Sequence, residues 1–444
     1  MKRLFFLSVL LPSILFAQHT IRGKFSPAKD YNVALLYKVT PTVSDYITNA
    51  EVGADGSFQF KLDANAAKGM YRIVYAVPQE DYNFDIIFNG KEDIELTFNS
   101  ETGVTFLNSI ENKLLASYTD SMSMVTQSLG NYFRQQSKDT LALKAIFKTQ
   151  AETQSSFETA AKNTIALHFI KANKPYIPKE FKNMETYVNN VRAHYFDFVD
   201  FNNEILQSSS FLEERMLNYV FGMSFKSVDE IAGYMKNVDV FCKAMKSTPI
   251  KVKRILLASL WQQMADLSHE DVANYIAENY LMDIAVSLND QELLHGLILY
   301  KNLSIGNVAP DFYLEKGEVK KESTKKMSTL KVADRYIILF WSSTCSHCLN
   351  EVPQLQAYLK PKGKNQVKVV AVALEEDTAN WKRLITDYPE FIHVYGSGKW
   401  DNEIGNDYGV TATPTYFVLN KNKEIIAKPE DFEALKVFFE NEKE

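Results

Sequence analysis

Residues 337–355 read IILFWSSTCSHCLNEVPQL, which is an apolar strand, a short polar turn and the start of a helix. The strand pattern ends at Trp341, and the helix pattern begins near Cys345. Cys348 follows three residues later, so the two cysteines share one face of the helix at a separation that suits a disulfide. Free backbone N–H groups and the positive end of the helix dipole stabilise a thiolate at a helix N-terminus. The stretch therefore predicts a redox-active pair at the mouth of a helix.

The order of the two cysteines predicts different roles for them. Cys345 is expected to be the exposed nucleophile, and Cys348, one turn deeper, to attack the mixed disulfide and release the product. His347 lies between them and can bring positive charge close to Cys345. Such a charge lowers the pKa of the thiol and makes the pair a stronger oxidant. The alternative is that His347 only faces water.

Other uses of two cysteines at this spacing fit the sequence poorly. Covalent haem attachment needs a histidine directly after the second cysteine, where Leu349 stands. A zinc site needs a second pair of ligands, and this part of the sequence has none. Cys242 lies on an apolar helical stripe and is interpreted as a packed small hydrophobe. We therefore expect no metal and no cofactor.

Residues 304–444, around the pair, alternate between strand and helix patterns. The predicted strands are Tyr336–Trp341, Val367–Leu374, Phe391–Tyr395, Thr415–Leu419 and Glu424–Ala427. The predicted helices are Cys345–Leu359, Thr378–Tyr388, Asn402–Tyr408 and Asp431–Asn441. This alternation predicts an α/β domain whose sheet is buried on both faces.

Two further domains are predicted upstream. Residues 18–106 hold short runs rich in Val, Ile, Tyr and Phe that are separated by turn signals, which favours a β-sandwich-like domain. The runs are His19–Phe25, Asn32–Val39, Ser57–Leu62, Met70–Val77, Tyr82–Phe88 and Asp93–Phe98. Residues 107–300 have few turn dipeptides and a helical apolar spacing, which predicts an α-helical domain of about seven helices. The expected fold class is thus multidomain.

The N-terminus has the layout of a secretory signal. Lys2 and Arg3 precede an almost entirely apolar run, Leu4–Phe16, which Ala17 closes. We expect residues 1–17 to be cleaved off and the chain to be exported, to the periplasm of a Gram-negative cell envelope. The run is shorter than the ~20 residues that span a bilayer, and no later stretch is long and apolar enough, so the mature chain is expected to lack a membrane span.

The net charge bears on the choice of partner. The formal charge is −6, and losing Lys2 and Arg3 takes it from −6 to −8. Because an acidic protein repels phosphate backbones, nucleic acid is a poor candidate partner.

Three motifs, in this order, carry a family resemblance. Gly306–Phe312 reads GNVAPDF; Trp341, Cys345, Cys348, Glu351 and Pro353 form the second motif; Tyr408–Thr415 reads YGVTATPT and forms the third. Together they resemble the entry strand, active-site helix and cis-proline loop of the TlpA/ResA-like thiol–disulfide oxidoreductases, which have a thioredoxin fold. The resemblance covers about a third of the chain. The two upstream domains resemble accessory modules that precede thioredoxin domains in exported proteins.

The resemblance implies roles for individual residues. Pro414 should be cis and face the cysteines, leaving the backbone of Thr413 free to pair with a bound cysteine-containing segment. Glu351 should relay protons to the buried thiol, the alternative being an exposed helix residue. Trp341, together with His347, Thr413 and Pro414, is expected to serve substrate binding or tuning of the pair.

The implied function is that of a cell-envelope thiol–disulfide oxidoreductase. Its expected partners are protein thiols or disulfides and a membrane-bound or periplasmic electron donor. Ser346 and His347 depart from the dipeptides common in reductases of this group, so the direction of electron flow stays open. The alternative is a binding module for a glycan or protein, with a thioredoxin-like domain of structural role. Its sugar-stacking candidates, which core packing also explains, are Tyr71, Tyr75, Tyr82 and Phe84.

Overall fold

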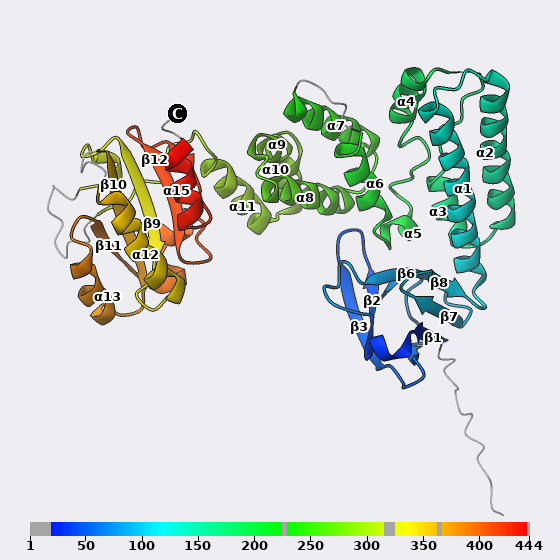
Figure 1. Cartoon of the computed structure of the whole chain (residues 1–444), viewed down its shortest axis with the longest axis horizontal. Coiled ribbons are helices and arrows are strands. Elements are labelled where there is room, and N and C mark those ends of the chain that lie inside the picture. Colours follow the sequence, from blue (N-terminus) through cyan, green and yellow to red (C-terminus); the bar gives the residue numbers. More distant parts are fainter. Residues whose placement is uncertain (1–18, 181, 224–228, 315–324, 362–365, 442–444) are drawn as a thin grey trace, which may run out of the picture. The chain divides into compact units, whose positions relative to one another are not determined.

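The computed structural model describes residues 19–180, 182–223, 229–314, 325–361 and 366–441. The predicted signal, residues 1–17, lies outside the described residues. The chain divides into two compact units, residues 1–263 and 264–444, and the boundary falls inside helix α8 (Ile250–Asp266). Figure 1 traces the elements of both units. Across the described ranges, no helix has the length and apolar character needed to cross a membrane.

The first unit begins with two four-stranded sheets, ordered β4-β1-β7-β8 and β3-β2-β5-β6. The strands are β1 His19–Ser26, β2 Val33–Val39, β3 Ser44–Glu51, β4 Ser57–Leu62, β5 Gly69–Val74, β6 Asn83–Phe88, β7 Ile94–Asn99 and β8 Gly103–Phe106. One core joins the sheets: Ile21 and Phe60 from the first pack with Leu36 and Ile73 from the second. The β-sandwich-like prediction is confirmed.

Two strands of this domain, β3 and β8, were not predicted. Both lie at the edge of their sheet, and β3 buries none of its side chains fully. An edge strand with a solvated surface lacks the apolar alternation from which strands are recognised. By contrast, β4 alternates buried Phe58, Phe60 and Leu62 with exposed side chains, and its predicted bounds are those observed.

Packing accounts for three of the four aromatic residues considered for sugar stacking. Tyr71 is 3 % exposed, and its ring meets that of Phe88 edge-on. The rings of Tyr75 and Phe84 have centroids 4.5 and 5.0 Å from that of Phe98, which belongs to the domain core. Only Tyr82 among the four is exposed, at 42 %.

Helices follow the β domain. In the first unit they are α1 Ile110–Arg134, α2 Thr140–Ala160, α3 Ala166–Ala172, α4 Met184–Ala193, α5 Glu204–Gln207, α6 Phe211–Val220, α7 Glu230–Ala244 and most of α8. The second unit continues with α9 Glu270–Ile276, α10 Met282–Leu288 and α11 Gln291–Asn302. The described residues of this region thus hold eleven α-helices instead of the approximately seven predicted, because four of them (α3, α5, α9 and α10) have only four to seven residues and leave little periodicity in the sequence.

The second unit holds a five-stranded sheet of order β11-β10-β9-β12-β13. Its strands are β9 Arg335–Trp341, β10 Val367–Glu375, β11 Ile392–Ser397, β12 Thr415–Asn420 and β13 Ile425–Ala427. Its helices are α12 Ser346–Leu359, α13 Ala379–Leu384, α14 Glu403–Asp407 and α15 Phe432–Asn441. Strands β9, β10 and β11 run parallel, whereas β12 runs antiparallel to β9. This is the predicted α/β architecture, a thioredoxin fold.

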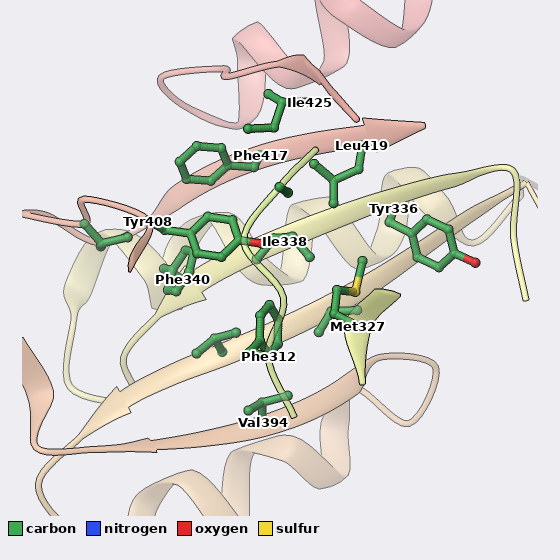
Figure 2. Packing of buried hydrophobic residues seen from close by; sticks show 14 of the residues in the cluster. Phe312, Met327, Tyr336, Ile338, Phe340, Val394, Tyr408, Phe417, Leu419 and Ile425 are labelled. Atoms are coloured by element: carbon green, nitrogen blue, oxygen red, sulfur yellow. The ribbon is translucent and has the colours of Figure 1, made fainter. Parts of the chain in front are cut away.

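Apolar residues cover both faces of this sheet. On one face Ile337 and Leu339 pack with Val352 of α12 and Leu435 of α15. On the other face Tyr336, Ile338 and Phe340 pack with Phe312, Met327 and Tyr408, as Figure 2 shows. Successive residues of β9 point to opposite faces, so a strand buried on both sides reads as one apolar run.

Strand register brings three chain segments to one edge of the sheet. Trp341 at the end of β9 pairs with Ala373, close to the end of β10. Thr415 at the start of β12 pairs with Phe340. The turn after β9, the end of β10 and the loop before β12 therefore meet where the cysteines lie.

Candidate active site

Cys345 is the N-cap residue of α12. Its backbone is extended, and its sulfur accepts a hydrogen bond from the backbone N–H of Cys348 at 3.2 Å. The first N–H groups of a helix have no partner within the helix, so the sulfur takes the place that a serine or aspartate oxygen often fills. Cys345 as a residue is partly exposed. The structure thus places Cys345 where the sequence analysis expected it, at the mouth of the helix.

The surroundings of Cys345 favour its ionised form. Partial burial opposes ionisation, but hydrogen bonds from the side chains of Cys348 and Thr413 and from the backbone N–H groups of Cys348 and His347 outweigh it and lower the pKa of Cys345. Cys348 has the opposite environment, because it is fully buried and hydrogen-bonded to Cys345, which raises its pKa to about 12. The pair therefore combines one thiol that ionises readily with a second that needs help to lose its proton.

The loop before β12 lies against the first cysteine. The Thr413–Pro414 peptide bond is cis, and the Cys345 sulfur lies 3.2 Å from the carbonyl oxygen of Thr413. Thr413 and Pro414 are both partly exposed. An extended segment that brought its own sulfur to Cys345 would run beside this stretch of backbone.

Glu351 lies one turn after Cys348 and is half-buried. Its Oε2 atom accepts a hydrogen bond from the Tyr416 hydroxyl at 2.9 Å and another from the backbone N–H of Phe432 at 3.0 Å. Phe432 is the first residue of α15, so the carboxylate also stabilises a helix N-terminus. Burial, and then the charge of Glu351, raise the pKa of Tyr416, and the nearby Cys348 adds to this shift.

Tyr416 was not predicted as a site residue. It is 1 % exposed and shares an apolar cluster with Cys348 and Trp341. Its backbone pairs with that of Leu339, whose side chain belongs to the same cluster. The available signal was the apolar run of β12, which is buried from Tyr416 to Leu419 and so marks Tyr416 as buried without showing which face of the sheet it takes.

Trp341 and His347 differ in their surroundings. Trp341 is 1 % exposed and packs edge-on against Tyr388. Its indole can therefore influence the cysteines only through the packing of the core. His347 is exposed, and the group that it directs at Cys345 is its backbone N–H.

A buried acid, Glu375, also touches the site and was not predicted. It ends β10, is 4 % exposed, and accepts a hydrogen bond from the backbone N–H of Ser343 in the turn before Cys345. The sequence signal was an acid at the end of an apolar strand, but that signal alone does not reveal the partner.

A metal site and the third cysteine were the other candidates for chemistry. Among the residues that the structure describes, no three His, Cys, Asp or Glu side chains gather closely enough to hold a metal ion. Cys242 lies in the first unit on α7, where burial raises its pKa to about 12.

Comparison with known proteins finds relatives of part of the second unit. The thioredoxin-like family model matches residues 334–425. ResA, a thiol–disulfide oxidoreductase of Bacillus thuringiensis, is 29 % identical over 128 residues, which cover 28 % of this chain and 69 % of ResA. The sporulation thiol–disulfide oxidoreductase A of Bacillus subtilis is 30 % identical over 91 residues, which cover 20 % of this chain and 54 % of that protein.

Solved structures include similar chains. A domain of a possible thiol–disulfide isomerase from Cytophaga hutchinsonii is 26 % identical, with a TM-score of 0.26, and the match covers 32 % of this chain and 93 % of that domain. A thioredoxin-like protein from Bacteroides caccae is 17 % identical, with a TM-score of 0.32, over 60 % of this chain and 97 % of that one. The family model and the ResA matches show that the C-terminal domain is thioredoxin-like and similar to the ResA thiol–disulfide oxidoreductases, and this similarity supports oxidoreductase activity of the chain.

Proposed function

We propose that the chain exchanges disulfides with protein thiols through Cys345 and Cys348, in the cell envelope. One observation carries the proposal: a partly exposed cysteine whose sulfur caps a helix and a fully buried cysteine one turn deeper, with opposite pKa shifts. The cis-Pro loop supports it, because Thr413 offers backbone to a bound segment directly beside Cys345. Added as a strand, a substrate would bring its sulfur to the nucleophile.

The exchange takes two steps. In the reducing direction the Cys345 thiolate attacks a substrate disulfide, so that a mixed disulfide forms and one substrate sulfur leaves and takes a proton. Cys348 then loses its proton, attacks the Cys345 sulfur and releases the second substrate thiol. Two electrons pass to the substrate, and the reverse sequence oxidises a dithiol. The potential of the pair relative to its partners sets the direction, and an imidazolium at His347 would raise that potential.

Glu351 is proposed to receive the proton of Cys348. Because burial holds the Cys348 thiol in its protonated form, the second step needs a base nearby. The Tyr416 hydroxyl donates to Glu351 and lies in the same apolar cluster as Cys348. A proton leaving Cys348 could thus reach the carboxylate through Tyr416.

We also propose that residues 1–17 direct export of the chain and that it acts in the periplasm of a Gram-negative cell. In the reducing direction, a membrane-bound or periplasmic donor would re-reduce the pair. When the full chain is expressed in a Gram-negative host, we expect a periplasmic product that begins at Gln18, because cleavage follows Ala17. N-terminal sequencing of the fractionated protein measures this. A cytoplasmic product that keeps the leader would contradict the export proposal.

Substitution of each cysteine tests the mechanism. Cys345→Ser should abolish insulin reduction, because the attacking sulfur is lost. Cys348→Ser should stop at the mixed disulfide and accumulate a covalent substrate adduct on Cys345, visible by mass spectrometry. Cys242→Ser is the matched control and should keep full activity. The mechanism is wrong if the Cys345→Ser chain still reduces insulin at the wild-type rate.

Removal of the proposed base tests Glu351. Glu351→Gln should slow the release of the mixed disulfide by roughly 10²-fold at neutral pH, the scale of general-base contributions. The loss should shrink at alkaline pH, where hydroxide can remove the proton. Stopped-flow kinetics of the second step provide the measurement. Glu433→Gln, on the exposed face of α15, is the control. Equal rates for Glu351→Gln and wild type would rule out the relay.

A further inference from the structure

Glu375 occupies an unusual place for an acid. It is 4 % exposed at the end of a central strand, and its backbone carbonyl accepts the N–H of Gly398. Among the described residues, no Lys, Arg or His lies within ion-pair distance of its carboxylate. A buried carboxylate costs free energy unless charge or hydrogen bonds compensate it. Its observed partner is the backbone N–H of Ser343.

Ser343 belongs to the turn that carries the nucleophile. Within the described chain, the three N–H groups of residues 343–345 each donate one hydrogen bond. Thr344 and Cys345 donate within the turn, to the hydroxyl and the carbonyl oxygen of Ser342 at 3.3 and 3.2 Å. Only Ser343 donates to another element. The carboxylate of Glu375 is therefore the link through which these N–H groups fix the turn to the sheet.

The link is also an electrostatic one. Consecutive Cα atoms are ~3.8 Å apart, so a carboxylate bonded to Ser343 lies within roughly 15 Å of the Cys345 sulfur, two residues further along the chain. Buried charges at this range are screened far less than charges in water. A negative charge there opposes the thiolate and so favours the disulfide over the dithiol. The exposed acids Glu376 and Asp377 follow directly in the chain. Burial, and then the charges of Asp377 and Glu375, raise the pKa of Tyr395 on β11.

We propose that Glu375 is a positioning residue of the redox site: its carboxylate holds the turn that carries Cys345, and its charge biases the pair towards the disulfide. This inference rests on the proposed function of the pair. Cys345 caps α12 and Cys348 lies within that helix, whereas Glu375 ends β10. The proposal thus gives a residue of another element control over the reaction of the two sulfurs.

Two substitutions separate the parts of the proposal. Glu375→Gln keeps an oxygen that can accept the Ser343 N–H and removes the charge. Glu375→Leu removes both and leaves a buried N–H without its acceptor, which destabilises the turn. Glu376→Gln is the matched control, because it makes the same change one residue later on the exposed surface.

The first readout is the equilibrium of the full chain with a glutathione redox buffer. We expect Glu375→Gln to shift the pair at least about threefold towards the dithiol, equivalent to ~14 mV for a two-electron couple. Glu376→Gln should leave the equilibrium unchanged. The second readout is kcat/KM for insulin reduction, in which Glu375→Leu should fall at least about tenfold below Glu375→Gln because its turn is no longer held.

Several results would overturn the inference. It fails if Glu375→Gln has the wild-type equilibrium, if Glu376→Gln shifts as far, or if the Leu and Gln variants reduce insulin equally fast. In those cases the wild-type chain still shows a reversible couple, and the proposed function stands. If the wild-type pair itself shows no couple, both proposals fall together.

Discussion

The backbone N–H of Cys348 donates a hydrogen bond to the sulfur of Cys345, and the site is organised around that contact. The contact caps the start of helix α12, and it also stabilises the thiolate form of the attacking sulfur. An N-cap needs an acceptor for the free N–H groups of the first turn, and an ionised sulfur is a better acceptor than a thiol. The same turn of helix carries Cys348 into the core, where burial keeps it protonated. One local structure thus makes two like residues chemically different.

Strand pairing in the sheet brings further polar groups to the two cysteines. Parallel pairing of β9 and β10 brings Glu375 beside the turn before Cys345, and antiparallel pairing of β12 with β9 brings the Thr413 carbonyl to the sulfur. On the inner side, Glu351 is held by Tyr416 and by the start of α15. Each of these polar groups is wholly or partly buried and has a hydrogen-bond partner, as buried polar groups require. These groups are therefore satisfied polar contacts around the two sulfurs.

Much of this could be predicted from the sequence because it is local. The bounds of β4 and the apolar run of β9 follow from side-chain alternation and burial, and the spacing of Cys345 and Cys348 follows from helix geometry. The contacts of Glu375 and Tyr416 could not be predicted in the same way, since they depend on strand register between segments far apart in the chain. The exposure of His347 likewise depends on the side-chain direction at a helix start, which its place between two cysteines does not fix.

The pH dependence of alkylation, followed separately at each cysteine of the reduced chain by peptide mass spectrometry, tests this account most directly. Cys345 should react with iodoacetamide with a midpoint below the ~8.5 of an ordinary thiol, because hydrogen bonds favour its thiolate. Cys348 should stay unmodified until strongly alkaline pH, in keeping with a pKa of about 12. Equal midpoints, or earlier modification of Cys348, would contradict the division of roles between the two sulfurs.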